Sequence, residues 1–264
     1  MAQTMGTVDK ALILLEFFTV AEPEWGLSEL ARRAGHDKAT TLRLMNSLMR
    51  GGFVEQHPAS KKFRLGRNIL KLARVREASF PIATVVEPVL NGLTAETGET
   101  AHAALGSGSG MITIGIAEPQ RSTRVYVDPS QPLPFHATAS GIAYLAFADQ
   151  QTVEGVLSST FEKHTERTVR NAGELRKVLS DTRTRGFAIS ARTFETEVVG
   201  IAAPFFDTTG HVYGTVAVAT VASRFSQDIE PSIAAAVRRA ANEVTAAIGG
   251  VPPIESALVE ETTT

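Results

Sequence analysis

The fold of the N-terminal third of the chain is decided by the stretch DKATTLRLMNSLMRGG, residues 37–52. Asp37 is a residue type that caps helices, and the apolar residues after it recur at helical spacing. Gly51 and Gly52 end the pattern at a point where a positive φ angle is easily adopted. The stretch therefore predicts one short helix, whose buried stripe is formed by Leu42, Leu44, Met45, Leu48 and Met49.

Segments on both sides of this stretch complete a recognisable order of elements. Residues 8–20 have apolar side chains at helical spacing, and a second helix is expected between a cap at Ser28 and a stop at Gly35. Residues 53–65 predict a small hairpin around a polar turn, and residues 68–79 predict a further helix. The order helix, helix, tight turn, helix, hairpin, helix is typical of a winged helix-turn-helix domain.

The helix over residues 37–52 is expected to present a polar face to solvent. Thr and Asn side chains bond phosphates or base edges, while Lys and Arg bond phosphates or guanine. Ala39 and Leu42 interrupt this polar set, either as helix packing or as contacts to a thymine methyl group. The predicted DNA contacts are Lys38, Thr40, Thr41, Arg43 and Asn46 on the helix, with Lys61, Lys62 and Arg64 on the hairpin.

Charge is distributed unevenly along the chain. Residues 27–76 hold twelve Lys and Arg against three Asp and Glu, a net charge of +9, while the remaining residues carry −11. A short basic segment on an acidic body indicates local contact with a polyanion such as double-stranded DNA. The alternative is an ordinary three-helix domain with a charged surface, but the turn, the polar face and the basic hairpin together favour DNA binding.

Composition limits the other classes of protein. A length of 264 residues with 43% hydrophobic residues suits two folded domains, and no run is long enough to span a membrane. The absence of cysteine excludes disulfides, thiolate metal sites and a cysteine nucleophile. The six histidines show no spacing typical of a metal site, so neither a metal nor a cofactor is expected. Without a secretion signal at the start, we expect a cytoplasmic protein.

The rest of the chain predicts a second domain of mixed helix and strand. We expect residues 1–78 to form the winged helix-turn-helix domain with a linker helix, residues 79–250 a second domain, and residues 251–264 a disordered tail. The fold class is therefore α+β with an antiparallel sheet. The elements expected in the second domain are helices at 82–96, 138–147, 149–157, 171–185 and 228–248, and strands at 100–105, 111–117, 125–127, 187–189, 198–206 and 212–221.

Six short segments carry a resemblance that covers about residues 5–250. They are GLSELA at 26–31, KATTLRL at 38–44, FRLG at 63–66, PFHATASG at 134–141, RGFA at 185–188 and IAAPFFD at 201–207. On these segments the chain resembles the IclR family of bacterial transcriptional regulators. The resemblance implies a GAF-like α/β effector-binding domain, dimerised winged-helix domains and often a dimer-of-dimers tetramer. It also implies regulation of catabolic operons by small organic acids or aromatic compounds.

The resemblance also implies the location of an effector pocket. Where relatives that bind small polar acids carry acids, thiols or hydroxyls, this chain has one hydroxyl, one glycine and two alanines. Thr193 stands where a glutamate is usual, with Glu195 and Glu197 nearby. We therefore expect a bulkier, more apolar effector, such as an aromatic acid, whose carboxylate meets backbone N–H groups at a helix start. The positions carried over are Ala139, Ser140 and Gly141 at the helix start, and Ser190, Gly200, Ala217 and Ala219 on the strands.

Four further polar side chains are candidate partners of the effector, and alternative interpretations remain open for two of them and for two of the pocket residues above. His102 could be a satisfied core histidine, His136 a structural loop residue, and the two pocket alanines simply close-packed strand residues. The remaining two candidates are Arg124 and Tyr126.

Two other functions compete with a ligand-responsive regulator. A hydrolase could use Ser140 beside His136, but Ala139-Ser140-Gly141 lacks the Gly-x-Ser-x-Gly elbow and no acid orients the histidine, so we predict no enzyme and no catalytic residue. A DNA-binding protein regulated by a partner protein remains the second alternative. The prediction is a repressor of a catabolic operon that binds operator DNA and a small-molecule effector as a homodimer or tetramer.

Overall fold

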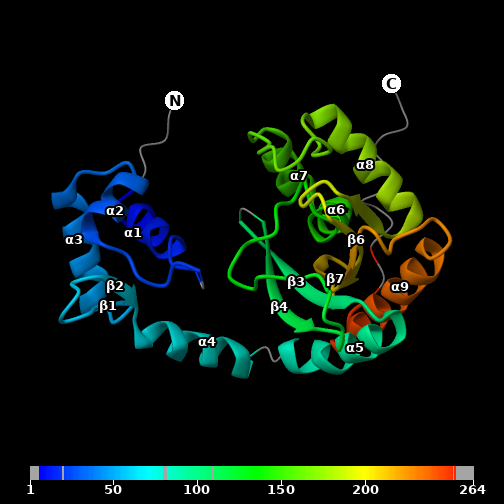
Figure 1. The fold of residues 1–264 in the computed structure, drawn as a ribbon, viewed down its shortest axis with the longest axis horizontal. Coiled ribbons are helices and arrows are strands. Elements are labelled where there is room, and N and C mark those ends of the chain that lie inside the picture. Colours follow the sequence, from blue (N-terminus) through cyan, green and yellow to red (C-terminus); the bar gives the residue numbers. More distant parts are fainter. Residues whose placement is uncertain (1–5, 20, 80–81, 109, 252, 254–264) are drawn as a thin grey trace. The chain divides into compact units, whose positions relative to one another are not determined.

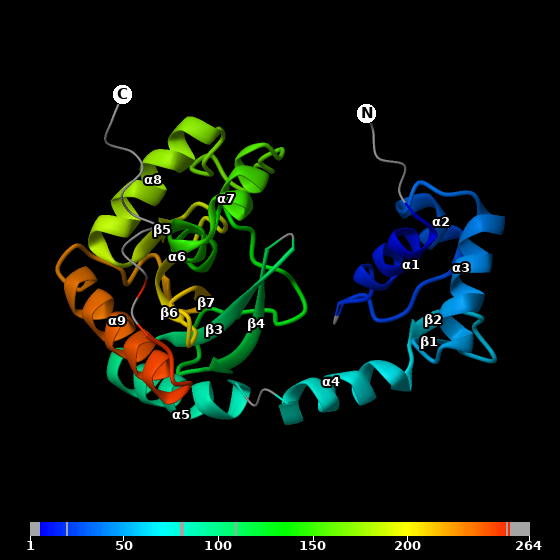
Figure 2. The same cartoon turned by 180° about the vertical axis from the view of Figure 1, so that it is seen from behind.

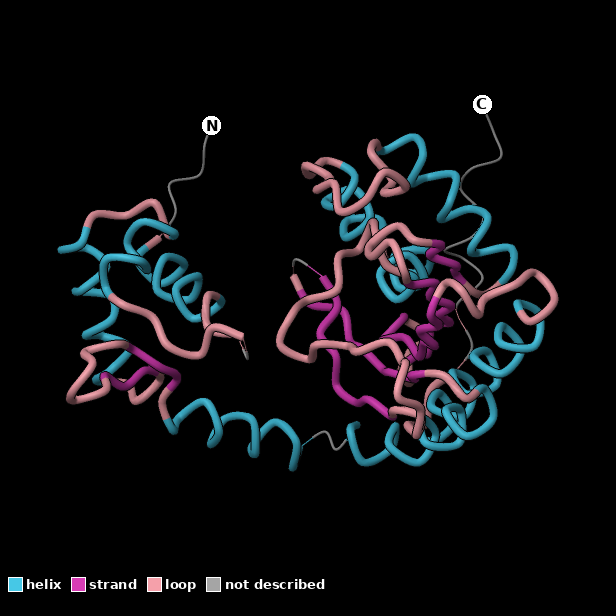
Figure 3. Tube along the Cα trace, viewed as in Figure 1, coloured by secondary structure: helices cyan, strands magenta, loops and turns pink. Residues whose placement is uncertain are grey.

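The computed structural model describes residues 6–19, 21–79, 82–108, 110–251 and 253. The chain divides into two compact units, Met1–Pro81 and Ile82–Thr264. The first unit is mostly helical and carries a two-stranded sheet, whereas the second is built on a five-stranded sheet flanked by helices (Figure 1, Figure 3). The prediction of a mixed α+β chain with an antiparallel sheet is confirmed.

The first unit has the predicted order of elements. Its two strands pair antiparallel and form the hairpin that the sequence places after the third helix. The elements are α1 (Thr7–Glu16), α2 (Leu27–Arg33), α3 (Lys38–Arg50), β1 (Val54–Gln56), β2 (Phe63–Leu65) and α4 (Arg67–Ser79).

The hairpin of the first unit is fixed to the helices by one residue. Backbone N–H and C=O groups of Trp25 exchange two hydrogen bonds with Phe63, at 2.9 and 2.8 Å, and the Trp25 indole Nε1 donates to the carbonyl of Phe17 at 2.8 Å. Phe63 is fully buried, in the same core as Leu14 and Leu30. The hairpin and the helices therefore share one hydrophobic core.

The turn between α2 and α3 follows the sequence, with one correction. Gly35 adopts a φ of +64°, the left-handed conformation that a helix end favours. Asp37 caps α3 as predicted, because its carboxylate accepts hydrogen bonds from the backbone N–H and the hydroxyl of Thr40, both at 2.8 Å. The predicted cap at Ser28 is wrong: Gly26 occupies the cap position of α2, and Ser28 is the second residue of that helix.

The second unit is an antiparallel sheet between two layers of helices (Figure 1, Figure 2). The strand order is β4-β3-β7-β6-β5. The strands are β3 (Thr100–Ser107), β4 (Gly110–Ala117), β5 (Ala188–Ala191), β6 (Val198–Phe206) and β7 (Val212–Val221). Helices α5 (Ile82–Thr97) and α9 (Glu230–Ala247) pack on one face, and α6 (Ala139–Phe147) packs on the other with α7 (Gln150–Leu157) and α8 (Ala172–Arg185).

The two faces of this sheet carry side chains of different size. Because side chains alternate along a strand, Val216 and Val218 of β7 point into the core with α5 and α9, while Ala217 points toward α6. In β6, Ile201 likewise faces α5 and α9, and Ala202 faces α6. The face under α6 is thus built from small residues.

One predicted strand of the second unit is wrong. Residues 125–127 join no sheet ladder, although Val125 is buried and Tyr126 is 64% exposed, as the alternation suggested. The Thr100 hydroxyl donates to the carbonyl of Val125 at 2.7 Å, and Met111 exchanges two backbone hydrogen bonds with Leu133. Residues 125–133 are therefore a strap fastened to the sheet at both ends. The predicted disordered tail lies outside the described residues, except for residues 251 and 253.

Alanine substitutions at two helical glycines of the second unit test how closely α6 is packed. A Cβ atom on Gly141 would lie 2.4 Å from the Cα atom of Phe135, whereas one on Gly92 meets nothing within 4 Å. We expect Gly141→Ala to lower the free energy of unfolding by about 1–3 kcal/mol through overpacking. The matched control Gly92→Ala should raise it by up to ~1 kcal/mol through helix propensity. Denaturant titration of both variants measures this, and equal stabilities would contradict the packing of α6.

Candidate nucleic-acid interface and ligand pocket

Helix α3 presents its cations to solvent, as the sequence predicts. The side chains of Lys38 and Arg43 are exposed, and Asn46 is half-buried beside them. Thr40 is half-buried, and its hydroxyl donates to the carboxylate of Asp37. These hydrogen bonds from Thr40 lower the pKa of Asp37, so the cap is charged at neutral pH.

Two predictions on α3 are wrong because Thr41, and not Leu42, completes the buried stripe with Leu44, Met45 and Leu48. Thr41 was expected on the exposed face, yet it is fully buried and its hydroxyl donates to the backbone carbonyl of Asp37 at 3.0 Å. Leu42 was expected in the core, yet its side chain is 40% exposed. Thr41 therefore cannot contact DNA, whereas Leu42 stands on the surface that would.

The hairpin carries three basic side chains, of which two lie in its turn. Lys61 and Lys62 are exposed, and Lys61 has a left-handed φ of +57°. Arg64 lies on β2 and pairs with Glu55 of β1, its Nε atom 2.7 Å from a carboxylate oxygen. The charge of Arg64 is therefore partly compensated by Glu55, while Lys61 and Lys62 present their charges to solvent in the turn.

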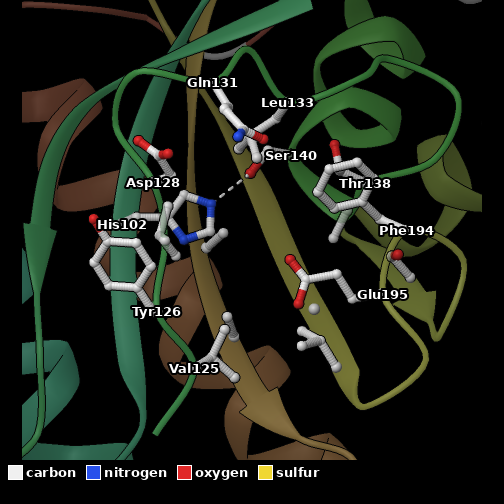
Figure 4. A pocket seen from close by; sticks show the side chains of 17 residues that line it. His102, Val125, Tyr126, Asp128, Gln131, Leu133, Thr138, Ser140, Phe194 and Glu195 are labelled. Atoms are coloured by element: carbon white, nitrogen blue, oxygen red, sulfur yellow. Dashed lines mark hydrogen bonds between the residues drawn. The ribbon is translucent and has the colours of Figure 1, made fainter. Parts of the chain in front are cut away.

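A cavity of about 310 Å³ lies in the second unit, between the small-residue face of the sheet, the start of α6 and the strap (Figure 4). Its wall brings together eight of the residues predicted from the sequence. These are His102, Tyr126, Ala139, Ser140, Ser190, Gly200, Ala217 and Ala219.

Close approach of α6 to the sheet shapes this cavity. A Cβ atom on Gly200 would lie 3.2 Å from the Cβ atom of Ala139, so the glycine lets the helix start sit against β6. Across the ladder, Gly200 pairs with Ala219 and Ala202 pairs with Ala217. The alanines are therefore not only close-packed strand residues, because two of them form part of the cavity wall.

His102 is one of the buried polar residues of the cavity wall. Its Nε2 atom and the Oγ atom of Ser140 are hydrogen-bonded at 3.1 Å, as drawn in Figure 4. Its Nδ1 atom is buried and has no hydrogen-bond partner among the described residues. Burial lowers the pKa of His102 to about 4, so the imidazole is neutral at physiological pH. The interpretation of His102 as a satisfied core histidine is thus wrong for one of its two nitrogens.

Other wall residues were not predicted as contacts. Phe194 and Glu195 come from the loop between β5 and β6, and Asp128 comes from the strap (Figure 4). Burial raises the pKa of Glu195 above its usual range. The wall residues of this cavity include no Lys or Arg. The sequence placed Glu195 near the pocket but could not show that the strap folds across the cavity.

Three predicted effector contacts lie outside the cavity wall. The backbone N–H of Gly141 donates to the cap hydroxyl of Thr138 at 3.1 Å, so it does not point to a ligand. Arg124 is exposed and pairs with Glu118 at 2.9 Å. His136 lines a separate hollow, where its Nε2 atom donates to the backbone carbonyl of Glu162 at 2.9 Å. His136 therefore has the loop role that was its alternative interpretation.

The geometry speaks against a hydrolytic triad at Ser140. The histidine bonded to Ser140 is His102 and not His136, and the second nitrogen of His102 has no carboxylate to orient it. Among the described residues, no group of His, Asp and Glu side chains could hold a metal ion. In that same part of the chain, no helix is long and apolar enough to cross a membrane.

Two family models match successive parts of the chain. Residues 7–58 match the IclR helix-turn-helix domain, and residues 77–246 match the bacterial transcriptional regulator IclR C-terminal domain. The Transcriptional repressor IclR of Escherichia coli (strain K12) is 28% identical over 248 residues, covering 93% of this chain and 90% of that protein.

Two solved structures extend this similarity. An IclR transcriptional regulator from Silicibacter sp. TM1040 is 39% identical, with a TM-score of 0.87, and the match covers 95% of this chain and 99% of the other. An IclR homologue from Microbacterium hydrocarbonoxydans, solved in complex with 4-hydroxybenzoate, is 21% identical with a TM-score of 0.75, covering 92% and 99% of the two chains, and shows the fold alone. The chain belongs to the IclR family of bacterial transcriptional regulators.

Proposed function

We propose that this regulator is a repressor of a catabolic operon. A small aromatic or organic acid, bound in the cavity of the second unit, either releases it from its operator or strengthens its binding there. The observation that carries the proposal is the cavity itself. It has an apolar wall, a neutral histidine and a helix N-terminus, on the same chain as a helix-turn-helix unit. Such a combination of an apolar pocket with a few placed polar groups is typical of a small-molecule site.

In this proposal, α3 enters the major groove of the operator and the hairpin turn contacts the adjacent backbone. Lys38 and Arg43 supply the helix contacts, and Lys61 and Lys62 meet phosphates. Because recognition helices of such dimers read half-sites about one turn of DNA apart, we propose a homodimer or a dimer-of-dimers tetramer on a pseudo-palindromic operator.

The proposed ligand has an apolar body and one carboxylate. The body would lie against Ala217, Ala219 and Phe194, beside the neutral imidazole of His102, which pairs with Ala217 across the ladder. The backbone N–H groups of Ala139 and Ser140 are in the first turn of α6 and have no partner within the helix, so they suit an anion. The 4-hydroxybenzoate bound by the Microbacterium hydrocarbonoxydans homologue supports an aromatic acid.

A ligand would act by shifting a conformational equilibrium. Ser190 and Thr193 both donate hydrogen bonds to the carbonyl of Ala137, which tethers the β5–β6 loop to the segment that leads into α6. A molecule in the cavity touches both segments, and it favours whichever arrangement it binds more tightly. The operator affinity then changes by the same coupling free energy.

The DNA-binding part of the proposal is tested with two single variants of α3. Lys38→Ala and Arg43→Ala should each weaken operator binding by about 1–3 kcal/mol if the residue reads a base, and less if it meets only a phosphate. The matched control is Arg176→Ala, an exposed arginine of the second unit that pairs with Glu154. Fluorescence anisotropy with a labelled operator gives the affinities, and circular dichroism verifies folding. Unchanged affinity in both α3 variants would place the interface elsewhere.

The ligand part of the proposal predicts a pH dependence. An anion in the cavity disfavours the charged form of Glu195, whose pKa is already raised by burial, so binding of an aromatic carboxylate should take up a proton. Affinity should therefore fall as the pH rises through that raised pKa. Glu195→Gln should remove the dependence. Calorimetry with 4-hydroxybenzoate and its neutral amide separates the effect of the anion from that of the ring.

Two results would count against this ligand assignment. Affinity for the carboxylate that rises with pH would mean that Glu195 does not face the bound anion. Operator binding that no small molecule alters would favour regulation by a partner protein instead.

A further inference from the structure

We infer that the neutral arc on the exposed face of α3 reads A·T base pairs, with the Leu42 side chain in contact with the 5-methyl group of a thymine. This inference rests on the proposed insertion of α3 into the major groove, and it adds which base pairs the helix selects. The residues concerned are Ala39, Leu42 and Asn46.

The exposed side chains of α3 follow a definite order around the helix. With about 3.6 residues per turn, Leu42, Asn46 and Ala39 follow one another around α3 as a continuous neutral arc of its exposed face. This arc lies between Lys38 on the side of Leu42 and Arg43 on the side of Ala39. Cations on both sides suit the phosphates that flank a groove, and the neutral arc between them is placed to meet base edges.

The side chain of Leu42 does not belong to the buried stripe that packs into the protein core. The buried stripe of α3 consists of Thr41, Leu44, Met45 and Leu48, all less than 9% exposed, while Leu42 is 40% exposed. Single exposed leucines are common on protein surfaces, but this one stands on the face that would approach DNA, one helical turn from the methyl group of the exposed Ala39. Ala39 and Leu42 together form a small apolar area among cations.

The hydroxyl groups of this face already have hydrogen-bond partners within the helix and its cap. The Thr40 hydroxyl is occupied by the carboxylate of Asp37. The Ser47 hydroxyl donates to the carbonyl of Arg43 at 3.1 Å and accepts from the Arg50 guanidinium at 2.9 Å. Within the neutral arc, base contacts therefore come from two alkyl side chains and one carboxamide.

The chemistry of the major groove then selects the partner. Thymine carries a C5-methyl group, the apolar feature of the base edges in that groove, and adenine presents the N6 and N7 pair that a carboxamide matches with two hydrogen bonds. Leu42 and Asn46 lie four residues apart, on the same side of the helix. The alkyl side chain of Leu42 matches thymine and the carboxamide of Asn46 matches adenine, so both select an A·T base pair. We therefore expect each half-site to contain A·T pairs under this part of α3.

The test uses the full-length protein and DNA that differs by one methyl group. An operator is first selected from a pool of random duplexes, and each thymine is then replaced singly by deoxyuridine, which lacks only the 5-methyl group. We expect wild-type protein to lose about fourfold in affinity at one or two thymines in each half-site, which is the value of one buried methyl group. Leu42→Ala should bind the thymine and deoxyuridine forms of those sites equally.

Leu70→Ala serves as the matched control, because Leu70 is a 57% exposed leucine of the same unit that lies on α4. It should keep the full preference for thymine. The inference is overturned if wild type shows no thymine preference at any position, or if Leu42→Ala keeps it, while selection of an operator still upholds DNA binding. Failure to enrich any duplex would overturn the proposed function and this inference with it.

Discussion

The ligand pocket depends on the unequal size of the side chains on the two faces of one sheet. Val216, Val218 and Ile201 fill the space below α5 and α9, while the opposite face offers glycine and alanine to α6. Gly200 allows α6 to start directly on the sheet, and the short side chains beyond it leave a cavity that the helix does not fill. Larger residues on that face would close the pocket without changing the fold, because the core on the other face would remain.

The same reasoning applies to polarity inside the pocket. A buried imidazole with one free nitrogen is stable there because it is neutral, and a wall without Lys or Arg leaves a helix N-terminus as the site for an anion. Glu195 adds a carboxyl group whose charged form is disfavoured by burial. A ligand bound as proposed would therefore be selected by shape and hydrogen bonding more than by charge.

Most of the fold could be predicted from the sequence, because strong local patterns decide it. The cap at Asp37, the glycine stops and the alternation in β6 and β7 each depend on neighbours along the chain. The errors arose where tertiary context decides. Leu42 and Thr41 exchanged their expected places because both fit a helical stripe, and only the packing of α1 and α2 against α3 fixes which one is buried.

The cavity wall was predictable to a smaller degree. The four strand positions carried over from the family resemblance lie in the wall, since sheet register fixes them, and so do Ala139 and Ser140 of α6, whereas Gly141 does not. Arg124 and His136 do not, because the path of the strap and of the loop before α6 is set by long-range hydrogen bonds, such as those to Val125 and Glu162, that no local pattern encodes.

The central claim is that occupancy of this cavity controls operator affinity. The most direct measurement is fluorescence anisotropy of a labelled operator with wild type and Ala217→Leu, each titrated with aromatic acids beginning with 4-hydroxybenzoate. Because the leucine fills the cavity from the sheet side, we expect the variant to bind the operator as wild type does without ligand and to lose the ligand response. A variant that still responds like wild type would contradict the account.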